Sequence, residues 1–173
     1  MLVPPKELLE KLEKDSIHQQ WIKSHPESFL THFFCQLDNK FNSKSSWEIG
    51  YYDTNTKKIS VFLEQNDQFL IKPEDDVFKK ETDKVEGLKL DEVKINVEKS
   101  IEIFKENFPK YFPQEIIGDG FLILQTIKDK TFWNFTYITK RLKFVNLKIS
   151  VEDGSIESHE TVDLIDKGPV NKQ

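Results

Sequence analysis

The clearest pattern of hydrophobic and polar positions lies in residues 119–160. Four short runs there, GFLILQTIK, FWNFTYITK, FVNLKISVE and SIESHE, are rich in aromatic and β-branched residues. Such runs are typical of half-buried strands. Asp153-Gly154 separates the last two runs, and this pair between alternating runs is a strong hairpin signal because glycine accepts a positive φ readily. We expect an antiparallel β-meander here.

A comparable series of runs lies in the first half of the chain. Apolar positions alternate in SFLTHFFCQLD, residues 28–38, and WEIGYYD, KISVFLE and FLI follow with turn-forming residues between them. Helix is the alternative for the first of these runs, because Phe29, Phe33 and Leu37 also have helical spacing. The match with the second half, described below, favours a strand.

Helical patterns precede both sets of strands. Pro4-Pro5 before KELLEKLEK predicts a helix start, where a missing N–H costs nothing. Ser16 and Gln19 have the spacing of a capping box, which predicts that the helix breaks and restarts there. Pro26 is expected to end the second piece.

The second helix is expected to begin after Asn96, a residue type that caps helices. Its apolar stripe consists of Val97, Ile101, Phe104 and Phe108. Pro109 and Pro113 are expected to terminate it. Between the halves, residues 73–95 are dense in charge with scattered apolar anchors such as Val77 and Phe78. We expect this connector to run extended along a surface.

The order of patterns predicts an internal repeat. Each half has a helix, prolines, a strand that begins Phe-Leu, a strand that begins with Trp, and a strand with Ile-Ser-Val. We predict an α+β protein made of two tandem repeats of a helix followed by an antiparallel β-meander, with the helices packed on one sheet face. The predicted units are 1–72, the connector 73–95, 96–166 and the tail 167–173. One helix on one small sheet buries little apolar surface, which favours packing two together.

The strands that begin with Trp are expected to face the helices. The inward residues are Trp47, Ile49, Tyr51, Trp133, Phe135 and Tyr137, against helix stripes of Ile17, Trp21, Ile101, Phe104 and Phe108. The pattern leaves open whether the two sheets join edge to edge or pack as separate halves.

The second half resembles the PepSY domain. The resemblance rests on the helix, the Trp-containing strand and the element formed by Ile149, Val151, Asp153, Gly154 and Ile156. It covers residues 91–160 well and 5–72 in a degenerate form. The whole chain is also similar to uncharacterised small soluble archaeal or candidate-phylum proteins with two such halves. The PepSY resemblance implies an inhibitory or binding module, as in the propeptides of secreted metallopeptidases, without catalytic residues.

Composition narrows the classes of function. The 25 Lys+Arg and 30 Asp+Glu residues give a net charge of −5, which argues against a nucleic-acid partner. A single cysteine excludes an intrachain disulfide framework and a multi-cysteine zinc site. No apolar run approaches the ~20 residues that span a bilayer, and the N-terminus lacks a signal-peptide pattern. We expect a soluble cytoplasmic protein with no membrane partner, a monomer or weak homodimer.

Candidate chemical groups have structural interpretations. His18 and His25 fit no zinc spacing and are expected on a helix surface, and His32 is expected as a satisfied or edge histidine on a strand. Cys35 is expected in the core. The acidic runs Glu74-Asp75-Asp76 and Glu152-Asp153 are interpreted as solvated surface. Nucleic-acid stacking beside Lys140, Arg141, Lys143 and Lys148 would require exposed rings.

We therefore predict no catalytic residues, no cofactor-binding residues and no metal site, and expect that the protein is not an enzyme. The leading hypothesis is a non-catalytic protein- or peptide-binding module that uses a strand edge or a groove between the halves. The alternative is a small-molecule carrier or a pocket enzyme, in which sheet and helix enclose a cavity lined by Phe34, Tyr52 and Phe62. A purely structural role is the third interpretation.

Overall fold

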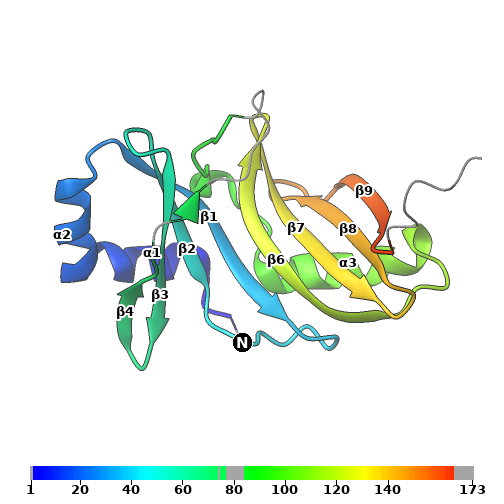
Figure 1. Ribbon diagram of the computed structural model, residues 1–173. Helices are drawn as coiled ribbons and strands as arrows, with labels where there is room; N and C mark the ends of the chain where they lie inside the picture. Colours follow the sequence, from blue (N-terminus) through cyan, green and yellow to red (C-terminus); the bar gives the residue numbers. More distant parts are fainter. Residues whose placement is uncertain (1, 74, 77–83, 166–173) are drawn as a thin grey trace, which may run out of the picture.

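The protein is one antiparallel sheet with helices on one side (Figure 1). The computed structural model describes residues 2–73, 75–76 and 84–165. The helical elements are α1 (Pro5–Glu13), α2 (Ser16–Ser24), the 3-10 turn η1 (Leu90–Glu92) and α3 (Val97–Tyr111). The strands are β1 (Ser28–Leu37), β2 (Glu48–Asp53), β3 (Lys58–Gln65), β4 (Gln68–Ile71), β5 (Asp75–Asp76), β6 (Ile117–Ile127), β7 (Lys130–Thr139), β8 (Lys143–Ser150) and β9 (Ile156–Asp163).

The two sets of strands join edge to edge through β1 and β6. The strand order is β4-β3-β2-β1-β6-β7-β8-β9, and the short β5 pairs with β3. All pairs are antiparallel, so the predicted α+β class with an antiparallel sheet is confirmed. Cys35 pairs with Leu122 at the junction. The predicted strand at residues 28–38 is therefore confirmed over helix, because β1 forms the centre of the sheet.

Register places the predicted inward residues on one face. Ile49 lies opposite Phe33, Phe33 opposite Leu124, and Leu124 opposite Trp133. Directly paired residues point to the same side of an antiparallel sheet. Trp47 is 1 % exposed and Trp133 is 0 % exposed. The prediction that these strands turn their rings into the core is confirmed.

The helices cover that face of the sheet. Phe104 of α3 lies 4.8 Å from the ring of Phe135, and Trp21 of α2 lies 5.5 Å from the ring of Tyr51. In Figure 1, α3 passes behind β6, β7 and β8, while α1 and α2 lie beside β2 and β3. Burial of a large aromatic side chain contributes about 1.5–3 kcal/mol, so this layer is the main source of stability.

The start of α2 differs from the prediction. The helix does break and restart, but Asp15, not Ser16, is the N-cap, and its carboxylate accepts a hydrogen bond from the Ile17 amide at 2.9 Å. Ser16 is already the first helical residue. Both types cap helices well, and a capping box with Gln19 would require Ser16 to be extended, which it is not.

Helix α3 begins as predicted and ends later. Asn96 caps it by accepting from the Lys99 amide at 2.8 Å. Pro109 was expected to terminate the helix, but it lies inside the last turn, and α3 continues to Tyr111. A proline so near the end removes only one intrahelical hydrogen bond, and the Phe112 amide still donates to the Phe108 carbonyl at 2.9 Å.

The β8–β9 connection has the expected glycine turn. Gly154 has φ of 76°, and its amide donates to the Ser150 carbonyl at 3.0 Å. Of the predicted connector, Val77 and Phe78 lie outside the described residues, as do the tail residues 167–173. The described part of the connector reaches the sheet at Leu88, whose amide donates to the Leu30 carbonyl at 2.9 Å.

Candidate functional site on the open face of the sheet

The sheet face that points away from α1, α2 and α3 is the candidate functional site, and we call it the open face. Its central row runs in register from Glu48 through Phe34, Ile123 and Asn134 to Lys148. In the described part of the chain, no helix packs on this face, because all three α-helices contact the opposite one. Among the described residues, aromatic rings on this face pack in pairs, Phe34 with Phe121 and Phe29 with Tyr52.

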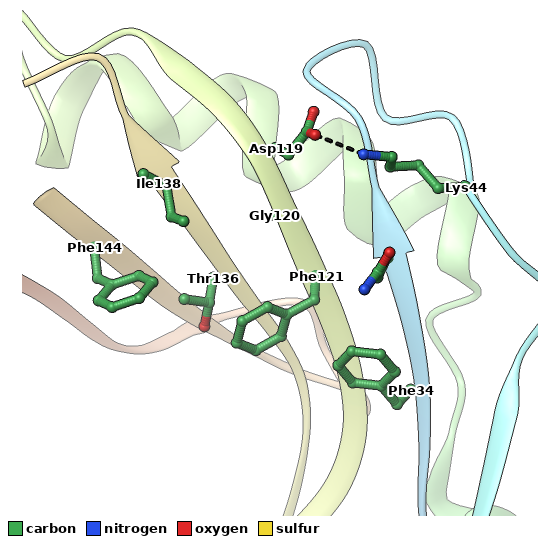
Figure 2. Close-up of a pocket in the computed structure, with 9 residues that line it drawn as sticks. Phe34, Lys44, Asp119, Gly120, Phe121, Thr136, Ile138 and Phe144 are labelled. Atoms are coloured by element: carbon green, nitrogen blue, oxygen red, sulfur yellow. Dashed lines mark hydrogen bonds and ion pairs between the residues drawn. The ribbon is translucent and has the colours of Figure 1, made fainter. Parts of the chain in front are cut away.

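A depression of about 230 Å³ lies on the open face over β1, β6, β7 and β8 (Figure 2). Its lining residues are Phe34, Gln36, Lys44, Asp119, Gly120, Phe121, Thr136, Ile138 and Phe144. The rings of Phe34 and Phe121 pack 5.6 Å apart. Ile138 lies opposite Phe144 and is 40 % exposed. The site is therefore an aromatic hollow that is partly accessible to solvent.

The rim of the depression carries an ion pair. Lys44 Nζ donates to Asp119 Oδ2 at 2.6 Å, and both side chains are largely exposed (Figure 2). Exposed pairs of this kind contribute about 0–1 kcal/mol because water screens them. This pair bridges the loop after β1 and the start of β6, so it holds one wall of the depression without adding net charge.

A polar cluster adjoins the depression on β7, β8 and β9, and consists of Asn134, Thr136, Asn146, Lys148 and Ser158. Asn146 Nδ2 lies 2.6 Å from Asn134 Oδ1 and 2.9 Å from Thr136 Oγ1, while Lys148 Nζ donates to Asn146 Oδ1 at 3.1 Å. Because the ammonium requires an acceptor, Lys148 fixes the orientation of the Asn146 amide. Thr136 belongs to both groups, so the polar and aromatic parts are continuous.

His32 lies on the open face across the backbone of Gly50. Its Nδ1 is 2.8 Å from Thr31 Oγ1, and that hydroxyl donates to the Gly50 carbonyl at 3.1 Å. Because the hydroxyl proton points to the carbonyl, this geometry favours the tautomer in which Nδ1 of His32 carries the proton. Burial lowers the pKa of His32 to about 4, against a smaller opposing effect of Glu48. The imidazole is neutral at physiological pH.

His18 contradicts the prediction of a surface histidine. It is 7 % exposed and packs between α2 and the sheet, 5.2 Å from the Tyr51 ring. Burial lowers its pKa, and its Nε2 has no hydrogen-bond partner among the described residues. The sequence pattern assigned only Ile17 and Trp21 to the inward side of this helix, and His18 was not recognised as a third inward position. His25 stacks on Trp21 at 4.2 Å.

Cys35 lies in the core as predicted. It is 0 % exposed, and burial raises the pKa of its thiol to about 12. The thiolate, which is the nucleophilic form, is therefore not accessible at neutral pH. This position has no features of a catalytic cysteine.

The acidic residues singled out in the sequence do not form a cluster in the described structure. Asp153 accepts a hydrogen bond from the Ser155 amide at 2.9 Å in the β8–β9 turn, and this bond lowers the pKa of the carboxyl. Glu74 lies outside the described residues, and Asp75 belongs to β5. Within the residues described, no group of three or more His, Cys, Asp or Glu side chains is arranged to hold a metal ion.

In two further sets of residues that were expected to act together, the members lie on opposite faces of the sheet. Phe62 is fully buried on the helix face, whereas Phe34 and Tyr52 belong to the open face, so these three do not line one cavity. The rings of Trp133 and Tyr137 are fully buried, so bases could not stack on them beside Lys148. Lys148 lies on the open face, whereas the rings of Trp133 and Tyr137 lie on the helix face.

Sequence reasoning missed the open face, although a signal was present. The runs FFCQL and GFLILQTI are apolar at both odd and even positions. A strand with one solvated face should alternate, and apolar residues of both parities indicate two apolar faces. Only the inward positions were assigned from the sequence.

The comparisons with known proteins show no family. No protein family and no curated protein matches the chain. The crystal structure of a Clostridium difficile 630 protein described as a "putative lipoprotein" aligns with 87 % of this chain and 97 % of its own, at 13 % identity and a TM-score of 0.49. So distant a likeness supports no conclusion about function. Among the described residues, no helix is long and apolar enough to cross a membrane.

Proposed function

We propose that this protein is a non-catalytic binding module that receives an apolar, extended peptide of a partner protein on the open face. The observation that carries the proposal is the aromatic depression of about 230 Å³, which no described helix covers. Its rings are presented by neighbouring strands of one sheet, so they are fixed in place before a ligand arrives. Preformed apolar hollows beside polar groups are typical of recognition sites.

The size of the depression favours a peptide over a small-molecule carrier. Pockets that enclose drug-sized ligands have volumes of about 300–1,000 Å³, whereas this depression measures about 230 Å³ and opens to solvent at Ile138. One or two apolar side chains fit it better than an enclosed ligand. The remaining contact area then comes from the flat parts of the open face.

The open face is also favoured over a strand edge. The outer edge of β9 has no strand partner in the described part of the chain, but it carries Glu157, Glu160 and Asp163. Charged side chains along an edge discourage pairing with another strand. At the other end, β4 has only four residues, which limits the hydrogen bonds an added strand could make.

We further propose that the two halves are tandem repeats, in keeping with the PepSY resemblance. Two matching hydrogen bonds support this. Trp47 Nε1 donates to the Val3 carbonyl at 2.8 Å, and Trp133 Nε1 donates to the Ile95 carbonyl at 2.7 Å. Each acceptor lies two residues ahead of a helix. A peptidase-regulating role is the form of peptide binding that the resemblance would imply.

Selection from a random dodecapeptide library on the immobilised protein tests the binding proposal. We expect enriched peptides with apolar residues at alternating positions. Phe121→Ser should weaken their binding by about tenfold or more, because truncation of an aromatic contact residue costs on the order of 1–3 kcal/mol. Val3→Ser, an exposed apolar position ahead of α1 on the helix side of the sheet, is the matched control and should leave affinity unchanged. Absence of enriched peptides, or equal effects of both variants, would overturn the proposal.

A further inference from the structure

The polar cluster beside the depression has more hydrogen-bond donors than acceptors. Lys148 has three donor protons, and one of them is used by Asn146 Oδ1 at 3.1 Å. Asn134 is 9 % exposed and uses its oxygen as an acceptor, so its amide N–H groups remain available. Ser158 Oγ is buried without a hydrogen-bond partner among the described residues.

These donors lie next to one another. Asn134 pairs with Lys148, and Lys148 pairs with Ser158, so the three side chains form a row across β7, β8 and β9 on the open face. Paired side chains of adjacent strands are about 4.5–5.5 Å apart at Cβ. One small group with two oxygen atoms could therefore contact all three residues.

The row is not neutralised by the protein in the described part of the chain. No carboxylate there lies within 4.0 Å of Lys148 Nζ, although Lys130 and Lys143 on the same strands have Glu157 and Asp163 as ion-pair partners. Glu160 is the nearest acidic residue on the same face by register, opposite Asn146. Lys148 is thus a half-buried cation surrounded by further donors, which is the chemistry that favours a bound anion.

We propose that this row binds the free C-terminal carboxylate of the partner peptide, while the apolar side chain of its last residue enters the depression. The inference rests on the proposed peptide-binding function and adds where the peptide ends. A carboxylate has one negative charge and two acceptor oxygens, which match a single lysine with amide and hydroxyl donors. Phosphate groups are more often held by arginine forks or several cations.

The depression and the polar row lie close enough together for a single peptide residue to reach both. Thr136 lines the depression, and Asn146 connects its hydroxyl at 2.9 Å to Lys148 at 3.1 Å. A single amide group therefore separates the wall of the depression from the ammonium. The backbone of a C-terminal residue and its own side chain span a comparable distance.

Paired peptide arrays test the inference. Octapeptides with Phe, Leu, Val, Ala, Lys or Glu at the last two positions are synthesised once with a free C-terminal carboxylate and once as the C-terminal amide. We expect the protein to bind free-carboxylate peptides that end in Phe, Leu or Val, and the matching amides about tenfold more weakly, the loss expected for a charge-assisted hydrogen bond.

Three variants assign the effect to the row. Lys148→Gln should bring the affinity ratio of carboxylate to amide peptides close to one, and Ser158→Ala should lower that ratio in part. Lys99→Gln removes the same charge from α3, on the opposite side of the sheet, and should leave the ratio unchanged. Circular dichroism verifies that each variant is folded.

The outcomes separate this inference from the proposed function. Equal binding of carboxylate and amide peptides, still weakened by Phe121→Ser, would overturn the carboxylate site and leave the peptide-binding function intact. Absence of binding to either array would overturn both. If octanoate displaced the peptides at a lower concentration than N-acetylphenylalanine, the site would be a fatty-acid site and the inference would be wrong.

Discussion

Gly50→Ala probes the contact between the His32 ring and Gly50 on the neighbouring strand β2. A Cβ atom at position 50 would lie 2.0 Å from His32 Cε1 and 2.4 Å from Nδ1. The ring must therefore move, and its bond to Thr31 Oγ1 at 2.8 Å must lengthen or break. The alanine itself is not strained, because position 50 does not have positive φ.

The expected magnitude follows from two opposing effects. Overpacking costs about 1–3 kcal/mol, and loss of the Thr31 bond adds about 1 kcal/mol. Alanine in a strand interior is favoured over glycine by about 0.5–1 kcal/mol, because glycine loses more backbone entropy on folding. We expect Gly50→Ala to lower the free energy of unfolding by about 1–3 kcal/mol. In the His32→Ala background it should raise stability by about 0.5–1 kcal/mol.

Urea unfolding of the wild type, the two single variants and the double variant measures the coupling. Gly87→Ala is the control, because a Cβ there would meet its nearest atom, Phe29 Cδ2, at an ordinary 3.6 Å. It should change stability by less than about 0.5 kcal/mol. An equal cost of Gly50→Ala with and without the imidazole would refute the reasoning, since the clash would then not involve His32.

Three further predictions concern the core and the histidines. The folded state requires neutral His32, whose pKa of about 4 lies below the usual 6.5, so stability should be full above pH 6.5 and fall by up to about 3 kcal/mol as the pH drops to 4. In a pH series of urea melts, His32→Gln should flatten this part of the curve and leave a smaller slope of the same sign from His18. An unchanged slope would contradict the assignment. Trp133→Phe should cost about 1–3 kcal/mol in thermal or urea unfolding, because the partly buried Ile95 carbonyl loses its indole donor; a neutral substitution would show that the bond is dispensable. Cys35 should react with a thiol reagent such as DTNB only after denaturation, and rapid labelling of the native protein would contradict its burial.

Much of the fold could be predicted from local sequence patterns. The alternation in the strands that contain Trp47 and Trp133 identified their inward faces, and Asn96 and Gly154 marked a helix start and a turn. These are properties of a few consecutive residues, since strand and helix periodicity are set by backbone geometry. The errors were local too, at Ser16, where a neighbouring residue caps the helix, and at Pro109, which the last turn accommodates.

The candidate site depended on tertiary structure. Phe34 and Phe121 come together only because β1 pairs with β6, and Asn134, Lys148 and Ser158 form a row only in the observed register. A shift of one residue would turn each of these side chains to the other face. The sequence by itself determined which segments are strands and which of their positions are apolar. Only the pairing of distant strands, and the placement of every described helix on one face, decided that the other face would remain open with this aromatic depression and polar row.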